Sequence, residues 1–587
     1  MLSTTEIRVL DLLPREPHEH EQGEQAHIRC RTRVVPISSD ADYETVSYVW
    51  GDPSNTSLIE VDGKNVAITK NLEAALRRIR LLETRTLWID QICINQDDNI
   101  EKANQIPLMR QIYSKTKQCL LWFGEIRSDI QLSDASSALD VIHFLNDFNE
   151  DSPVDIGVSY SSISEQTLPN IMKALRSIAL LENPWWHRVW TLQEAILPSK
   201  ASMLWGPLTI SWETILDAGQ NYVSQPVPEM FWPYIDILNR LFGQTNGLIH
   251  SKNGSEGPLY SAYRWSFRGA TNPLDKIYGI LGLFPSGTLP RSECVDYQLQ
   301  PASLFAMATA DLIENTKSLH PISLVYATGV PENTPNIPSW ACDFAVGGGQ
   351  HQLAVDGDGA SWYLIHAYYQ YRACGNKEID WELFRFDPNY NTLTLSGYMV
   401  DEVTITGTKL QSDVPGTTGV SYQSAISYIN DWYRTAEEFY QGREYPQDST
   451  GPENWSDSFW RGLLGGTIIN YEFIPEREAQ QEDIALAKEF VRTGQKDEEV
   501  CYSIFANMCH RIMFITKTGL LGFGANDMAI GDQVWVLDGG NWPFILRPSS
   551  GSPVPGSHHW VGSSYVHGIM GGEAATETHK SKSVCLI

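Results

Sequence analysis

Short apolar runs alternate with helical patterns over residues 43–125. Three runs rich in β-branched, aromatic and aliphatic residues predict strands, at 43–50, 86–91 and 119–123. Between them apolar residues recur at helical spacing, which predicts amphipathic helices at 72–82 and 100–113. Pro107 is expected to kink the second helix or to delay its start. Strands that alternate with helices predict an α/β domain with a parallel sheet over residues 1–205.

The pattern changes twice further along the chain. Residues 206–390 are mainly helical in pattern, with loops rich in Gly, Asn and Pro. Short β-like runs bounded by Gly or Pro follow at 392–395, 512–516, 533–537, 544–546 and 560–561. They predict a β-rich, cap-like or barrel-like module at 391–575, with a charged helical insertion at 474–500. We expect 576–587 to be a loose tail.

Composition narrows the classes of partner and compartment. The 587 residues favour two or three domains, and the net charge of -28 disfavours binding to nucleic acid or to anionic lipid. Nine scattered cysteines suggest reduced thiols in the cytoplasm rather than a disulfide framework. No basic stretch followed by an apolar run begins the sequence, and no segment reaches the ~20 apolar residues that span a bilayer. We therefore expect a cytoplasmic protein without a membrane span.

Three blocks in a fixed order carry a family resemblance: YETVSYVWGD at 43–52, LWIDQICINQ at 87–96 and RVWTLQE at 188–194. Further blocks are ATNPLDKIYGILGL at 270–283, PSW at 338–340, GDQVWVL at 531–537 and YVHGIMGGE at 565–573. Together they resemble the fungal heterokaryon-incompatibility (HET) family. The resemblance implies a stand-alone effector of growth arrest or cell death, triggered when non-self cells fuse, and thus a part in fungal innate immunity. HET domains are remotely similar to TIR domains, so it also implies a TIR/flavodoxin-like parallel sheet.

Some TIR domains cleave the nicotinamide–ribose bond of NAD with a glutamate on a helix that also carries a tryptophan. In this chain the resemblance assigns those roles to Glu194 and Trp190, which share a helix face because they are four residues apart. A fixed carboxylate can stabilise the oxocarbenium character that develops on the ribose. Nicotinamide leaves as a neutral molecule, so no general acid is required. NAD would be a substrate, and we expect neither a cofactor nor a metal.

Other side chains in the blocks could complete such a site. Asp90 ends a predicted strand, where ligands of open α/β sheets collect, and could orient a ribose or water as a second catalytic residue. Substrate-binding candidates are Tyr48 and Trp50 for stacking, Gly51 for approach of backbone to phosphate, and Arg188 for bidentate phosphate binding.

Each assignment has a structural alternative. Glu194 could instead bond a strand end, a helix end or a buried arginine. Asp90 could cap the loop at 95–99, and Arg188 could pair with an acidic neighbour. Four tryptophans in or beside these blocks could be core residues, namely Trp50, Trp88, Trp186 and Trp190.

Two hypotheses of function remain open. In one the chain consumes NAD, and in the other it is a non-enzymatic module that signals by self-association or by docking an unknown non-self recognition partner. Cys501, Cys509 and His510 could ligate a metal in principle, but no second close pair completes four ligands, so packed thiols are the better interpretation.

Overall fold

The computed structural model describes residues 2–14, 27–38, 42–148, 160, 162–254, 256–324, 334–345, 370–411, 413, 420–443, 445–446, 454–470, 475–508, 511–575 and 580–587. Two compact units divide the chain. Unit 1 comprises residues 1–288 and 293–298, and unit 2 comprises 289–292 and 299–587. The first unit thus extends past residue 205, the expected end of the HET domain.

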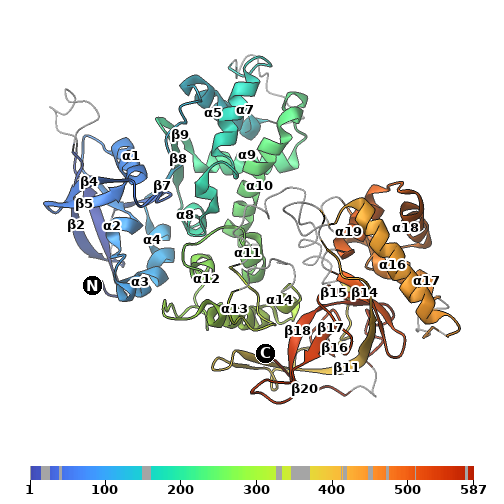
Figure 1. The fold of residues 1–587 in the computed structure, drawn as a ribbon. Coiled ribbons are helices and arrows are strands. Elements are labelled where there is room, and N and C mark those ends of the chain that lie inside the picture. The colour runs from blue at the N-terminus through green and yellow to red at the C-terminus, as the bar shows by residue number, and fades with distance from the viewer. Residues whose placement is uncertain are drawn as a thin grey trace. The chain divides into compact units, whose positions relative to one another are not determined.

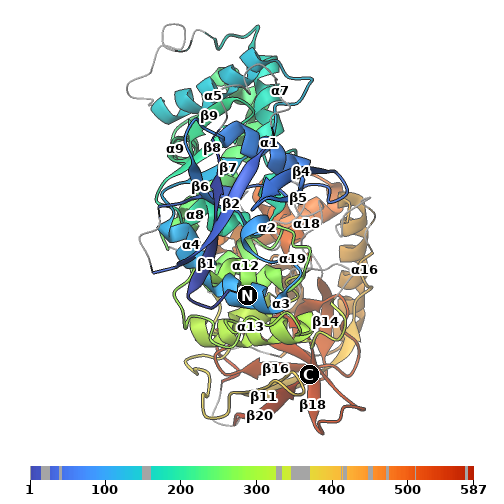
Figure 2. The same ribbon diagram turned by 90° about the vertical axis from the view of Figure 1, so that its left-hand side faces the viewer.

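Unit 1 is built on a mixed sheet with strand order β5-β4-β2-β1-β6-β3-β7-β8-β9 (Figures 1 and 2). Its middle strands run parallel to one another: β6 (Arg85–Trp88), β3 (Glu44–Ser47), β7 (Cys119–Trp122) and β8 (Ala201–Trp205). β3 and β7 are buried at every position, which is typical of parallel strands covered on both faces. The expected strands are therefore confirmed. When these four strands are numbered by their order along the chain, they lie side by side in the sheet as second, first, third and fourth.

Antiparallel strands extend this parallel set at both edges, which the sequence analysis did not predict. They are β1 (Glu6–Leu12), β2 (Arg29–Pro36), β4 (Thr56–Val61), β5 (Lys64–Thr69) and β9 (Leu208–Ser211). Only β2 and β4 pair in parallel among them. Asp62 and Gly63 connect β4 to β5, both with positive φ. This Asp-Gly pair is a hairpin signal in the sequence that the analysis missed.

The helices of unit 1 follow the expected apolar spacing. Those between the strands are α1 (Lys70–Ile79), α2 (Asp90–Cys93), α3 (Asn99–Gln105) and α4 (Met109–Lys115). Pro107 lies in a 3-10 turn, η3 (Ile106–Leu108), so the helix is interrupted as expected. Four further helices gather beside β8 and β9 (Figure 1): α5 (Leu132–Asp147), α7 (Leu168–Ile178), α9 (Trp212–Ser224) and α10 (Ile235–Lys252). Two more complete the unit, α11 (Pro258–Arg264) and α12 (Asp275–Leu281).

Unit 2 begins with two helices, α13 (Pro301–Thr316) and α14 (His320–Ser323), and continues as a β-rich region. The long strand β11 (Thr392–Thr406) closes a ring with β16 (Gln533–Leu537), β17 (Phe544–Pro548), β18 (Ser557–Ser563) and β20 (Lys582–Leu586). β14 (Arg511–Thr516) and β15 (Leu521–Ala525) extend the sheet from β11. All five expected strand segments lie within these elements.

The loose tail expected at 576–587 is wrong for residues 582–586, because β20 pairs with β11 and β18 and closes the ring. The charged insertion contains α18 (Gln481–Thr493), and the next helix, α19 (Glu498–Met508), starts near its end. With α16 (Tyr422–Tyr440) and α17 (Trp455–Leu463) these helices gather near β14 and β15 (Figure 1).

Candidate functional site

Glu194 lies in the short helix α8 (Thr191–Ile196), which follows the 3-10 turn η4 (Pro184–His187). Every residue of α8 is buried, and Glu194 is 3% exposed. The helix packs against β3, β7 and α4. Glu194 is therefore buried against the parallel strands, near Ser47, the last residue of β3.

Polar groups and charges surround the carboxyl of Glu194. Ser47, the last residue of β3, and Tyr113 of α4 lie close to it and lower its pKa. Its Oε2 atom accepts no hydrogen bond from the described residues. Burial raises the pKa of Glu194 to about 7; the guanidinium of Arg188 opposes this rise and the charge of Asp90 adds to it. Glu194 thus exchanges its proton near neutral pH.

Asp90 is the first residue of α2 and is separated from β6 by one residue, Ile89. Its carboxylate accepts hydrogen bonds from the indole N–H of Trp50 and the backbone N–H of Gln91, both at 2.8 Å, and lies 3.9 Å from Arg188 Nη2. Burial raises the pKa of Asp90, although these contacts oppose the rise. The side chain of Asp90 bonds Trp50 and Gln91 and not the loop at 95–99; its backbone oxygen does contact that loop, accepting the side-chain N–H of Gln96 at 2.9 Å.

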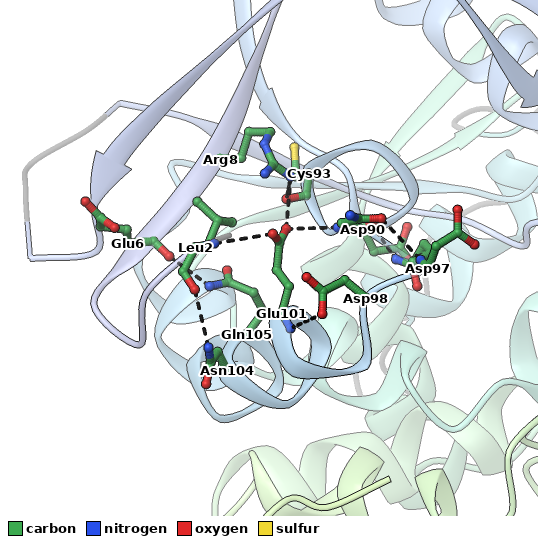
Figure 3. Close-up of polar contacts among 12 residues, drawn as sticks. Leu2, Glu6, Arg8, Asp90, Cys93, Asp97, Asp98, Glu101, Asn104 and Gln105 are labelled. Carbon is green, nitrogen blue, oxygen red and sulfur yellow. Dashed lines mark hydrogen bonds and ion pairs between the residues drawn. The ribbon is translucent and has the colours of Figure 1, made fainter.

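That loop is held by Glu101, as Figure 3 shows. The carboxylate of Glu101 accepts the backbone N–H groups of Asn95 at 3.0 Å and Leu2 at 3.3 Å, and pairs with Arg8 at 3.1 Å. Asp98 caps α3 by accepting two backbone N–H groups. These carboxylates accept the backbone N–H groups of Asn95, Ile100 and Glu101. The carboxylate of Asp90, which precedes the loop, accepts the indole N–H of Trp50 instead.

Arg188 joins the ends of β3 and β6. Its Nη1 donates to the backbone oxygen of Tyr48 at 2.5 Å, and its guanidinium lies 5.7 Å from the ring centre of Trp50. Tyr48 is buried and donates to Gln91 Oε1 at 2.9 Å, whereas Gly51 is exposed with φ +78°. Arg188 therefore pairs with an acidic neighbour, Asp90, as its structural alternative expected. Phosphate binding by Arg188 stays a proposal.

Trp190 has a different partner from the one that helical spacing suggested. Asp275, the first residue of α12, accepts the hydroxyl of Tyr297 at 2.7 Å. Burial raises its pKa, while Tyr297, the side chain of Trp190 and the charge of Arg188 lower it, so Trp190 lies beside this carboxyl. The sequence analysis missed Asp275 as a site residue, and the signal was its place in the block at 270–283.

The four tryptophans considered above divide into two groups. Trp88 and Trp186 are fully buried, as expected of core residues. Trp50 and Trp190 are half-buried; the indole N–H of Trp50 donates to Asp90, and Trp190 lies beside Asp275. Only the second group borders the candidate site.

Residues 265–283 hydrogen-bond to the segment that carries Glu194. The backbone N–H of Val189 donates to Gly269 at 3.1 Å, and Gln193 Nε2 donates to the oxygen of Gly279 at 2.9 Å. A side-chain carbon at Gly279 would meet Val189 at 2.8 Å, so glycine permits this close approach. The site therefore depends on residues well beyond 205.

Within the described ranges no group of three or more His, Cys, Asp or Glu side chains could hold a metal ion. Cys509 and His510, considered above as ligands, lie outside those ranges. No described helix is long and apolar enough to span a bilayer. Arg188 forms an ion pair with Asp90, and its charge lowers the pKa of the other two carboxyls of the site, Glu194 and Asp275.

Comparisons with known proteins agree with this organisation. Residues 43–194 match the family model "Heterokaryon incompatibility protein (HET)", and 468–587 match that of the Het-6 β-barrel domain. The chain is 24% identical to "Heterokaryon incompatibility protein 6, OR allele" of Neurospora crassa over 676 aligned positions, which cover 97% of this chain and 95% of the relative. No solved structure matches. The chain is therefore a heterokaryon incompatibility (HET) domain protein that also carries a Het-6 β-barrel domain.

Proposed function

We propose that this protein is an effector of heterokaryon incompatibility, acting in growth arrest or cell death, and that its HET domain cleaves NAD at the nicotinamide–ribose bond. The name of the Neurospora relative supports the first part. For the second part the main support is Glu194, a buried carboxyl with one oxygen unpartnered among the described residues and a pKa of about 7. The order of the parallel strands is also that of flavodoxin-like sheets, the expected TIR-like arrangement.

The proposed reaction needs one carboxylate. The bond between ribose C1′ and the pyridinium nitrogen breaks, its electron pair goes to that nitrogen, and neutral nicotinamide leaves. Glu194, when ionised, stabilises the positive charge that develops on the ribose. Water then adds to C1′ and releases a proton, which gives ADP-ribose. Asp90 would orient the ribose or the water, and Trp50 and Trp190 would border the nicotinamide ring.

Access to Glu194 requires movement of its neighbours, because its side chain is 3% exposed. Arg188 and Asp90 are more open, with side chains 24% and 18% exposed. In the present arrangement Arg188 contacts Asp90 and Trp50, so it would have to turn outward to bind a phosphate. Substrate binding and displacement of Arg188 would then be one event.

The test is release of nicotinamide from NAD by the purified full-length protein, measured by chromatography. Glu194→Gln should abolish release because the amide carries no charge, and Glu165→Gln, at an exposed position of the same unit, is the matched control. Equal release by wild type and Glu194→Gln would refute the assignment. Since activity could require assembly, the assay is repeated over a range of protein concentrations.

A second candidate is a non-enzymatic module that acts by self-association or partner docking. The observation that favours it is Asp90, whose carboxylate is already engaged by groups of the same unit. This candidate predicts that expression in fungal cells remains toxic with Glu194→Gln. Loss of toxicity from a folded Glu194→Gln protein would contradict it.

A further inference from the structure

Arg268 is a buried cation behind α8. It is 0% exposed, and its guanidinium carbon lies near four aromatic ring centres, at 4.8 Å from Trp265, 5.9 Å from Trp186, 5.9 Å from Phe267 and 6.0 Å from Trp185. Its Nη1 donates to the hydroxyl of Thr191, the first residue of α8, at 2.7 Å. Arg268 is thereby attached to the helix that carries Glu194.

Some of the N–H groups of Arg268 make no hydrogen bond to the described residues. Neither Nε nor Nη2 of Arg268 has a hydrogen-bond partner among the described residues, and the same holds for Oε2 of Glu194. Burial lowers the pKa of Arg268 to about 9, and the charge that opposes this fall is that of Glu194. Moving an isolated charge into the interior is costly, so a buried arginine needs an opposite charge nearby.

The charges around the site support this pairing. Arg188 is shared, because it forms an ion pair with Asp90 at 3.9 Å and also lowers the pKa of Glu194 and of Asp275. No carboxylate forms an ion pair with Arg268 within the described residues. The other titratable groups near Glu194 are hydroxyls and a thiol, which carry no positive charge: Tyr48, Tyr113 and Cys119.

We propose that Arg268 is a positioning residue that supplies positive charge behind Glu194 and so keeps that carboxyl ionised for the reaction. Only the catalytic consequence rests on the proposed NAD cleavage. The interaction of the two charges, which are farther apart than an ion pair, does not depend on that reaction and is measurable without substrate. It also places a functional residue of the HET domain outside the matched range of 43–194.

The test is the titration of Glu194 in the full-length protein, followed by NMR of 13C-labelled glutamate. The signal of Glu194 is identified by its loss in Glu194→Gln. Arg268→Met keeps apolar bulk against the four rings and removes the charge. We expect it to raise the midpoint of Glu194 by about one pH unit or more, with Arg268→Lys between the two.

Arg511→Met is the matched control, since it removes another buried guanidinium, 4.7 Å from an indole, from unit 2. An unchanged Glu194 midpoint in a folded Arg268→Met protein would overturn the proposal. If Arg268→Met does not fold, Glu194→Gln is added to it. Recovery of folding in the double variant supports the charge pairing, and failure to recover overturns it.

Nicotinamide release gives the catalytic readout. If Glu194 must be ionised, the pH below which release falls should rise in Arg268→Met by the same amount as the NMR midpoint, while activity at high pH is kept. A shifted midpoint without any release in wild type would leave the charge pairing standing and refute NAD cleavage. Release with an unshifted profile would overturn the role of Arg268.

Discussion

Replacing Glu194 by glutamine should change how the stability of unit 1 depends on pH. Burial raises the pKa of this carboxyl from its ordinary 4.5 to about 7. Between these values the native state binds a proton that the unfolded chain has released. The wild type therefore loses stability as pH rises through this window, because the native carboxylate must then exist where burial disfavours it.

The size of this stability change follows from the difference between the two pKa values of Glu194. Each pH unit corresponds to about 1.4 kcal/mol, so the interval of about 2.5 units corresponds to about 3 kcal/mol of unfolding free energy. Glutamine has nearly the same shape and does not titrate. The stability of Glu194→Gln minus that of wild type should therefore increase by about 3 kcal/mol between pH ~4.5 and pH ~7.5.

The assay is urea unfolding at a series of pH values, with hydrogen exchange measured by mass spectrometry on peptides from residues 185–200. Other groups titrate in both proteins, so the difference isolates Glu194. Glu165→Gln serves as the exposed control and should show no such trend. A difference between Glu194→Gln and wild type that stays flat across the window would refute the argument that burial dominates this carboxyl.

Two further predictions concern the segment behind the site. Gly279→Ala should destabilise unit 1 by about 1–3 kcal/mol in urea unfolding, because the added carbon meets Val189 at 2.8 Å, whereas Gly243→Ala in α10, with open space around it, should be neutral or slightly stabilising; equal effects would contradict this. A fragment of residues 1–298 should fold and show a cooperative transition by circular dichroism, whereas 1–205 should not, because it lacks the segment that holds α8; a cooperatively folded 1–205 would show that the segment is dispensable.

Local pattern was sufficient for much of the secondary structure. The buried runs at 43–50 and 119–123 became parallel strands because β-branched and aliphatic side chains covered on both faces favour that arrangement. Pro107 interrupted its helix because it lacks an N–H group. The antiparallel edges were missed, although Asp62 and Gly63 carried a turn signal.

The contents of the site were decided by tertiary structure. The spacing of Trp190 and Glu194 suggested that they act together, yet the indole lies beside Asp275, 85 residues further along, and the carboxyl lies near Ser47 and Tyr113. Hydrogen bonds between distant segments depend on strand order and packing, which no local period encodes. The sequence by itself determined the parallel strands of unit 1 and placed Glu194 on a helix; only the packed fold decided that this carboxyl is buried and which charges surround it.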